Sequence, residues 1–384
     1  MINFEKGTYG YDKNFLKKNI IEIVELKDKD SNASVLLAPG YQGRVMTSTA
    51  GGDKGLSFGW INYKLIESGR ILEHINPVGG EERFWLGPEG GPFSIYFEQG
   101  SEQIFDNWQV PAVLDTEPFE IIRQDSESVT FTKNSCLTNA SGAEFSIGIE
   151  RTVKLLHADS LSAIFHLNFS SPDIKLVAYQ SENKITNTGT GEWTKEKGLL
   201  SVWMLSMFNP SPATTVFLPY NTAGSGTVVN DDYFGKVPSE RLIIDSGTVF
   251  FKIDGKFRSK IGLPEERATE MCGSYDSQKN ILTLIWCSLP KEKKEYLNSK
   301  WGDQDNPYLG DVINAYNDGP VEDGSIMGPF YEIETSSPAA GLKPGESLTH
   351  TQRVVHIQGD EKNLAKLTYK LFKIDLQKIK SVFQ

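Results

Sequence analysis

The sequence predicts an all-β protein, built as a single antiparallel domain over residues 1–384 with a short helix near each end. Three observations predict it. Runs rich in β-branched and aromatic residues follow one another, each bounded by Gly, Pro, Asn or Asp. No helical segment stands between these runs, so parallel βαβ units are not expected. Helical periodicity is confined to two stretches, near residue 12 and beyond residue 360.

The two helices differ in how they are recognised. The first is predicted over 12–19, with Asp12 as its N-cap. The second is predicted from about 360 to 380, where large aliphatic side chains recur at roughly helical spacing against a Lys-rich face. These side chains are Leu364, Leu367, Leu371, Ile374 and Ile379. We expect this stripe to pack on the core rather than to lie on a membrane surface.

The strands are predicted mainly by composition and alternation. In 144–156, Phe145, Ile147 and Ile149 alternate with polar or small residues, which is typical of a strand with one buried face. The turn 342–345 joins the last two strands. The predicted strands are 144–156, 161–167, 174–188, 215–220, 248–253, 281–287, 330–335 and 347–357.

Composition and charge exclude several classes of protein. The chain has 39 Lys plus Arg against 50 Asp plus Glu, a net charge of −11, and no basic stripe, so no nucleic-acid partner is expected. The longest mostly apolar run, 199–208, is shorter than the ~18 residues of a spanning helix, so no membrane span is expected. Oligomeric state stays open. The N-terminus lacks an apolar segment typical of a signal peptide, which predicts a cytoplasmic protein, or a periplasmic or secreted one if a signal was removed.

No motif for a cofactor or a metal stands out. There is no HExxH and no P-loop Lys, and the one GxSxG match, 55–59, lies in a Gly-rich loop without the strand and helix of a nucleophile elbow. Five His and three widely spaced Cys predict neither a metal site nor a disulfide framework. The segment 303–323 is rich in Asp and includes Asp311, Asp318 and Glu322, but it does not match an EF-hand, and a plain acidic loop is favoured.

A Gly-rich segment, 79–91, is the first candidate for binding. It places five Gly around Arg83, Trp85 and Glu89. Gly lets the backbone approach a ligand closely. An aromatic face can stack on the apolar face of a sugar ring, while charged groups take its hydroxyls. The alternative is a Gly-rich hairpin with an exposed salt bridge.

The strand 330–335 supplies a second candidate. Phe330, Glu332 and Glu334 share one face of this strand, and the two carboxylates are about 6.6 Å apart along it. Two such carboxylates raise each other's pKa and can act as a general base or hold a cation. The alternative is a solvated outer face. Of the five His residues, His74 is the one expected near a site, since it precedes the Gly-rich segment.

Three stretches resemble the galactose mutarotase-like (aldose 1-epimerase-like) superfamily. They are 39–45, 183–189 and, most clearly, Glu332-Ile333-Glu334-Thr335 followed by Pro338, 342–346 and His350, which is similar to the pattern L-E-T-Q, P, L-x-P-G-E. The segments Gly-Gly-Glu-x-Arg-Phe-Trp and Tyr-Asn-Asp-Gly (316–319) resemble segments that recur in an uncharacterised bacterial branch of this superfamily. The resemblance implies a β-supersandwich and a sugar ligand.

The resemblance also implies roles for individual residues. Glu334 matches the general base that takes the proton of the anomeric hydroxyl. The acid of the family is a His, whereas the corresponding region here, 199–208, contains Trp203 and no His. His74 could supply this acid from another strand. Asp318, in the Tyr-Asn-Asp-Gly segment, and Glu332 are expected to bind substrate.

Three functions follow from these expectations. The first is an aldose 1-epimerase-like isomerase, in which Arg44 and Arg83 hold sugar hydroxyls or a carboxylate. The second is a sugar-binding protein without catalysis, in which Trp85, Trp203 and Arg83 carry the affinity. The third is a glycan-cleaving enzyme that draws an acid/base pair from Glu332, Glu334 and Glu89. The expected ligand is a mono- or oligosaccharide in all three.

Overall fold

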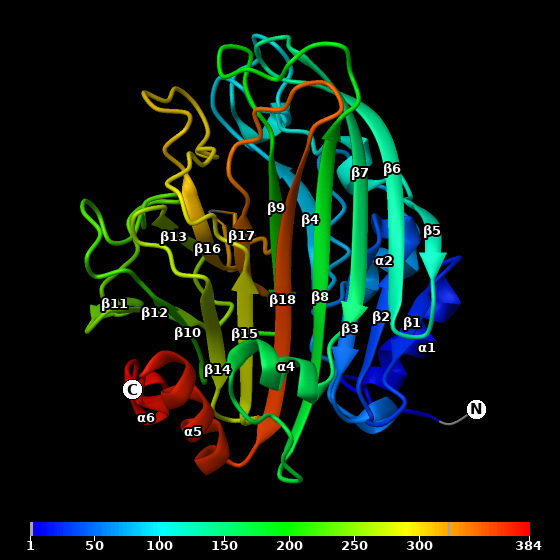
Figure 1. Cartoon of the computed structure of the whole chain (residues 1–384), viewed down its shortest axis with the longest axis vertical. Helices are drawn as coiled ribbons and strands as arrows, with labels where there is room; N and C mark the ends of the chain where they lie inside the picture. The colour runs from blue at the N-terminus through cyan, green and yellow to red at the C-terminus, as the bar shows by residue number, and fades with distance from the viewer. Residues whose placement is uncertain (1–2, 322) are drawn as a thin grey trace.

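A computed structural model describes residues 3–321 and 323–384 and contains three antiparallel sheets (Figure 1). The largest sheet has ten strands, in the order β11 (Leu242–Asp245), β12 (Thr248–Ile253), β10 (Thr214–Pro219), β14 (Met271–Asp276), β15 (Ile281–Cys287), β18 (Ser347–Gly359), β8 (Ile174–Asn187), β7 (Glu144–Leu155), β6 (Ser128–Thr138) and β5 (Glu120–Gln124). The second has five, in the order β13 (Ser259–Pro264), β16 (Asp311–Asn317), β17 (Tyr331–Ser336), β9 (Ser201–Phe208) and β4 (Arg83–Gly87). The third consists of β1 (Val24–Lys27), β2 (Ser34–Ala38) and β3 (Arg44–Thr49). This architecture confirms the predicted all-β class.

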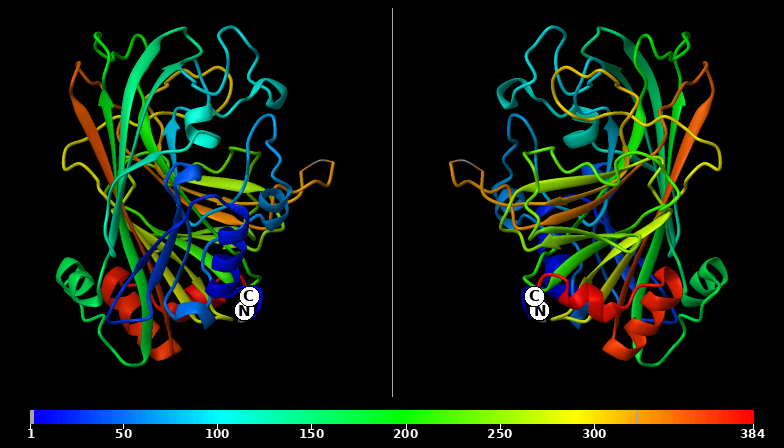
Figure 2. Two further views of the ribbon diagram at one scale, coloured as in Figure 1. Left: turned by 90° about the vertical axis from the view of Figure 1, so that its right-hand side faces the viewer. Right: turned by 90° about the vertical axis from the view of Figure 1, so that its left-hand side faces the viewer.

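The ten-stranded sheet follows the alternation read from the sequence. Along β7, buried and partly exposed residues alternate, and Phe145, Ile147 and Ile149 are at most 2% exposed. Alternation of this kind fixes the register, because a slip of one residue would turn every apolar side chain to the wrong face. The long strands of this sheet run along one side of the molecule, and the five-stranded sheet lies behind them (Figures 1 and 2).

Helices cover part of the outer face of the large sheet. They are α4 (Ala158–Phe165), α5 (Glu361–Phe372) and α6 (Leu376–Ser381), and they pack near β10, β14, β15 and β18 (Figure 1). Leu364, Leu367 and Ile379 join this packing, so the predicted aliphatic stripe lies on the core. The remaining helices are α1 (Tyr9–Asn19) and α2 (Tyr63–Ser68), beside the three-stranded sheet, and the short α3 (Ala112–Asp115). No helix in the described part of the chain is both long and apolar enough to cross a membrane.

Three local predictions are wrong in detail. The stretch 161–167, predicted as a strand, begins inside helix α4, where Leu161 and Phe165 are four residues apart and pack into the same cluster. The N-cap position of helix α1 is held by Thr8, without a side-chain capping bond, and Asp12 lies within the first turn. The C-terminal helix is two helices, because Lys373 takes a left-handed conformation (φ 60°) that ends α5.

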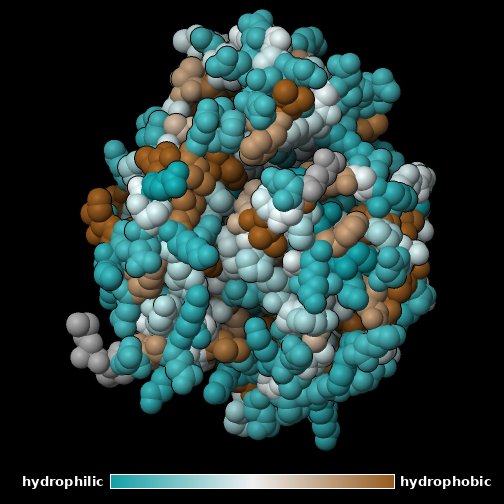
Figure 3. All heavy atoms as spheres, turned by 180° about the vertical axis from the view of Figure 1, so that it is seen from behind, coloured by the Kyte–Doolittle hydropathy of each residue, from teal (hydrophilic) through white to brown (hydrophobic). Residues whose placement is uncertain are grey.

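The five-stranded sheet is buried on both faces, and this positions the site. The strands β4, β9 and β16 carry only buried residues. One face holds aliphatic side chains such as Ile261, Ile313 and Ile333, which belong to the main core. The pairing register puts Arg83, Lys260, Glu332 and Glu334 together on the opposite face, the outer face of this sheet. Seen from behind, the molecule shows several separate apolar patches between hydrophilic side chains (Figure 3).

Candidate functional site

The outer face of the five-stranded sheet brings Glu334 into contact with two donors from other strands. Lys260 Nζ of β13 and Trp203 Nε1 of β9 each donate to Glu334 Oε2 at 2.8 Å. Glu334 is 1% exposed, and its other oxygen, Oε1, is buried and has no hydrogen-bond partner among the described residues. A buried acceptor without a donor is costly, so this oxygen is a natural position for a ligand hydroxyl.

Glu332 lies beside Glu334 on the same face of β17, as the sequence predicted. Its Oε1 accepts a hydrogen bond from Arg83 Nη2 at 3.3 Å, with both side chains less than 10% exposed. The guanidinium of Arg83 also stacks on Trp85, 3.9 Å from the ring centroid. Burial raises the pKa of Glu332 to about 8, against the opposing charge of Arg83 and with the help of Glu334. The structure therefore holds two neighbouring carboxyl groups in different environments.

Lys260 and Glu89 complete the charged group. Burial alone would lower the pKa of Lys260, but the charges of Glu334 and Glu89 outweigh it and the pKa is raised. Glu89 as a whole is only partly buried, yet burial of its carboxyl group raises its pKa, opposed mainly by Lys260. Gly90 is needed here, because a Cβ at this position would lie 2.2 Å from the carbonyl oxygen of Lys300. The segment around Lys300 can thus lie directly against that of Glu89.

A second group of polar side chains lies next to Lys260. Asp311 accepts hydrogen bonds from Asn230 Nδ2, at 2.7 Å, and from the hydroxyl of Tyr233. Asn314 donates to the same hydroxyl at 3.2 Å. Lys260 Nζ lies 5.4 Å from the ring centroid of Tyr233 and 4.8 Å from that of Trp203. Burial raises the pKa of Asp311 to about 6, opposed by its bonds to Tyr233 and Asn230.

Two loops cover this face. The first contains Asp232 and Tyr233, and the second contains Lys300 and Trp301. Lys300 Nζ joins them by an ion pair with Asp232 at 2.5 Å. Together with the strand residues they leave Glu334 and Trp203 at most 5% exposed, so the site is closed in this conformation.

Asp318 is close to the charged group, but its oxygens already have partners. Tyr316 donates its hydroxyl to Asp318 Oδ1 at 2.7 Å, and the backbone N–H of Gly328 donates to Oδ2 at 2.8 Å. Asp318 contributes to the raised pKa of Glu332 by charge repulsion. Its bonds fix the segment around Gly328, which is a positioning role.

Arg44 and His74 make their contacts elsewhere. Arg44 donates to the carbonyl oxygen of Gly79 at 2.8 Å and to Gln42 Oε1 at 3.1 Å, and burial lowers its pKa to about 9. His74 Nδ1 donates to the carbonyl oxygen of Trp108 at 2.8 Å, and its ring packs on Phe105 at 4.8 Å. The described contacts of these two side chains include none of the carboxylates of the group.

Trp85 and Trp203 lie together, with ring centroids 5.6 Å apart in an edge-on arrangement. Trp85 also donates Nε1 to the carbonyl oxygen of Leu114 at 3.2 Å, which fixes its ring. Trp108 follows at 6.4 Å from Trp85, and its buried Nε1 has no partner among residues 3–321 and 323–384. This aromatic row borders the charged group on the side of β4.

Sequence reasoning missed Lys260, Tyr233 and Asn314, and it assigned Asp311 to an acidic loop. None of them belongs to a motif, and each reaches the site through strand pairing or a covering loop. Asp311 in fact begins strand β16. The described residues hold no group of three or more His, Cys, Asp or Glu arranged for a metal ion, and Glu322 of the predicted acidic loop lies outside them.

A family model for a family of unknown function, DUF6786, matches residues 7–383. The chain belongs to this family. No curated protein sequence matches it. Among solved structures, the Slr1438 protein of Synechocystis sp. PCC 6803 is similar over 94% of this chain and 100% of its own, with 13% identity and a TM-score of 0.53.

A candidate aldose 1-epimerase of Escherichia coli K12 is similar over 88% of the DUF6786 chain and 99% of its own, with 10% identity and a TM-score of 0.53. At such identities the likeness concerns the fold. It confirms the resemblance to aldose 1-epimerase-like proteins at that level.

Proposed function

We propose that the protein is an aldose 1-epimerase-like isomerase of a free sugar or sugar acid, with Glu334 as its general base. The observation that carries the proposal is the arrangement of the Glu334 carboxylate. Lys260 and Trp203 hold one oxygen at 2.8 Å, and the other oxygen is buried and unpartnered. The two donors fix the orientation of the carboxylate, and the remaining oxygen is placed to accept a proton.

Glu332 is the proton donor in this proposal. The anomeric oxygen and the ring oxygen of an aldose are bound to the same carbon, so a base and an acid on one strand face can reach both. With a pKa of about 8, Glu332 carries a proton at neutral pH. His74, the donor expected from the sequence, has its Nδ1 on the backbone of Trp108.

The reaction then balances with these two groups. Glu334 takes the proton of the anomeric hydroxyl as the C1–O1 double bond forms and the bond from C1 to the ring oxygen breaks. Glu332 gives its proton to the ring oxygen. Rotation about the bond from C1 to C2 presents the other face of the carbonyl group, and the reverse transfers close the ring and restore both carboxyl groups.

Arg83 and the two indoles would hold the sugar. Arg83 is fixed over Trp85 with its buried Nε unpartnered in the described chain, and so has a donor left for a hydroxyl. The ring of Trp203 offers an apolar surface beside Glu334. Because the site is closed, the loops joined by Lys300 and Asp232 would have to separate to admit the ligand.

The second candidate is a sugar-binding protein without catalysis. The ion pair between Lys260 and Glu334 favours it, because the ammonium group and the indole N–H of Trp203 already occupy one of the two carboxylate oxygens. Trp203 stands in the strand where the resemblance implies a His acid. The third function, glycan cleavage, gains no support from two carboxylates on a single strand face, since a cleaving pair flanks the bond.

Anomeric exchange measured by NMR tests the proposal. Freshly dissolved aldoses and uronic acids would be followed with the wild type, Glu334→Gln, Glu332→Gln and the matched control Glu192→Gln, which changes an exposed Glu. We expect the wild type and the control to accelerate exchange, and each site variant to lose about a hundredfold or more. Binding without acceleration by the wild type would establish the second candidate instead.

A further inference from the structure

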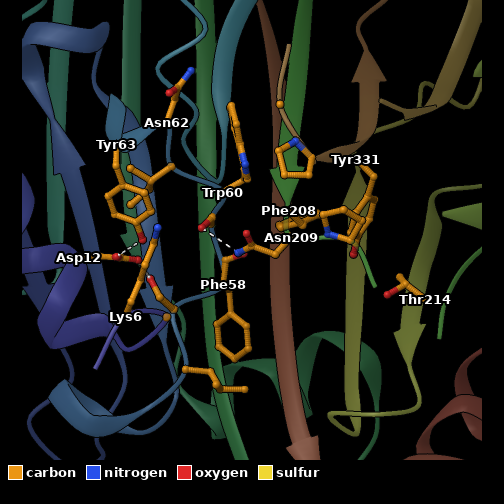
Figure 4. Close-up of a pocket in the computed structure, with 18 of the residues that line it drawn as sticks. Lys6, Asp12, Phe58, Trp60, Asn62, Tyr63, Phe208, Asn209, Thr214 and Tyr331 are labelled. Carbon is orange, nitrogen blue, oxygen red and sulfur yellow. Dashed lines mark hydrogen bonds between the residues drawn. The ribbon is translucent and has the colours of Figure 1, made fainter. Parts of the chain in front are cut away.

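A cleft of about 1180 Å³ opens in another part of the molecule. Figure 4 shows Lys6, Asp12 and Tyr63 on one side, Thr214 and Tyr331 on the other, and Phe58, Trp60 and Asn209 between them. The residues that line it include none of the five charged side chains of the candidate site (Arg83, Glu89, Lys260, Glu332 and Glu334). Trp60, which lines the cleft, packs on Phe330 at a centroid distance of 4.8 Å.

The wall of this cleft is aromatic and held in place. Phe58 stacks on His356, with centroids 4.3 Å apart and planes 16° apart. Phe208 packs on Tyr331 at 5.4 Å, and the hydroxyl of Tyr331 is bonded to Ser274 at 2.7 Å. Fixed apolar rings in a cleft of this size are typical of a site for a small molecule with a ring.

The rim of the cleft is basic. Lys6, Lys64, Arg70 and Lys279 line it, all four are exposed, and none forms an ion pair within the described chain. This is unexpected for a chain with a net charge of −11. Lys6 lies over the ring of Tyr63, with Nζ 4.5 Å from the centroid, so one cation is already next to the aromatic wall.

The acidic side chains of the cleft do not balance these cations. Asp12 accepts hydrogen bonds from Ser57 and from Tyr63, and burial raises its pKa. Asp276 caps a turn by accepting from two backbone N–H groups, at 2.9 and 3.1 Å. Glu5 is the remaining acidic group, and it is exposed. Four cations thus line the cleft against three acidic groups, and this excess of positive charge at an exposed rim can attract an anion.

We propose that this cleft is a second binding site, distinct from the carboxylate site, for a small phosphate ester that carries a ring. The ring packs against Phe58 and Trp60, and the phosphate lies at the basic rim, next to one or more of its four cations. The proposal does not depend on the isomerase, because the two sites share none of these residues.

Calorimetric titration of the full chain tests this site with four probes: glucose 6-phosphate, adenosine 5′-monophosphate, glucose and inorganic phosphate. We expect one or both esters to bind about tenfold or more tightly than glucose and inorganic phosphate, with binding weakened by salt. The two esters show whether a sugar or a base fills the ring position. Equal affinity for ester and inorganic phosphate would overturn the proposal.

Two sets of variants locate the binding. The double change Lys6→Gln/Lys279→Gln should weaken ester binding by about fivefold or more, because it removes two rim charges. The matched control Lys17→Gln/Lys18→Gln changes two exposed Lys of α1 that do not line the cleft, and should leave affinity unchanged. Glu334→Gln should also leave it unchanged. Equal effects of the two double variants, or loss of ester binding in Glu334→Gln, would show that the ester binds elsewhere.

Discussion

Removal of the Lys260 cation gives a direct test of the charged site. Lys260 is 8% exposed and Glu334 is 1% exposed, so their ion pair at 2.8 Å is screened little by water. In Lys260→Met, Trp203 remains as the one donor to Glu334 among residues 3–321 and 323–384, and a buried carboxylate loses its cation. Breaking one side of such a pair costs about 3–5 kcal/mol of unfolding free energy.

The double variant Lys260→Met/Glu334→Gln isolates this cause. It removes both charges, and Trp203 can still donate to the amide oxygen of Gln. Replacing both partners of a buried pair is often close to neutral, so we expect the double variant to recover about 2 kcal/mol or more of the loss. As a control, Lys300→Met breaks an ion pair with Asp232 whose side chains are 38% and 58% exposed, and should cost at most about 1 kcal/mol.

Equilibrium unfolding in urea measures all three variants. The expected order of stability at neutral pH is Lys300→Met first, then the double variant, and Lys260→Met last. The loss in Lys260→Met should shrink at low pH, where protonation removes the uncompensated negative charge. A double variant no more stable than Lys260→Met would refute the reasoning, since it would mean that lost packing, and not the buried charge, causes the loss.

Two further predictions concern pH. Burial raises the pKa of Glu332 from 4.5 to about 8, so between these values the folded state holds a proton that the unfolded state releases. The unfolding free energy of the wild type should therefore fall, relative to that of Glu332→Gln, as the pH rises from about 5 to about 8. Urea titrations at several pH values measure this difference. A flat difference would show that Glu332 is ionised in the folded state. Burial lowers the pKa of His350 from 6.5 to about 4, so the wild type should lose stability relative to His350→Gln as the pH falls through this interval; a constant difference would contradict a buried neutral imidazole.

The fold could be predicted where the sequence carries a local signal. Strand β7 alternates because one of its faces packs on the core, and its predicted and observed bounds agree within one residue. Strands β9 and β16 are buried on both faces, so their apolar and polar residues do not alternate. The segment 199–208, which contains β9, was therefore recognised from the sequence only as an apolar run. The wrong strand at 161–167 has the same origin, since a short apolar run does not distinguish a strand from a buried helix. That 1–384 forms a single domain stays a prediction.

The site could be predicted only where it lies on one strand. Glu332 and Glu334 share a face because they are two residues apart, and this needs no knowledge of the rest of the chain. Lys260 comes from β13, which pairs with β16, which in turn pairs with β17. Its contact with Glu334 depends on the register of both strand pairings, and the spacing of residues along the sequence does not predict this register.

Trp203 and Lys260 are best understood as a pair. Both donate to the same oxygen of Glu334, from strands on opposite sides of the charged residue. A His at the position of Trp203 could exchange a proton, whereas an indole N–H can only donate a hydrogen bond. The strand that would supply an acid by resemblance therefore supplies a second fixed hydrogen-bond donor, and Lys260 adds a positive charge 2.8 Å from the same oxygen. In such a site the proton donor has to come from elsewhere. Glu332 lies beside Glu334 on the same face of β17, and burial raises its pKa, which makes it our candidate for that donor.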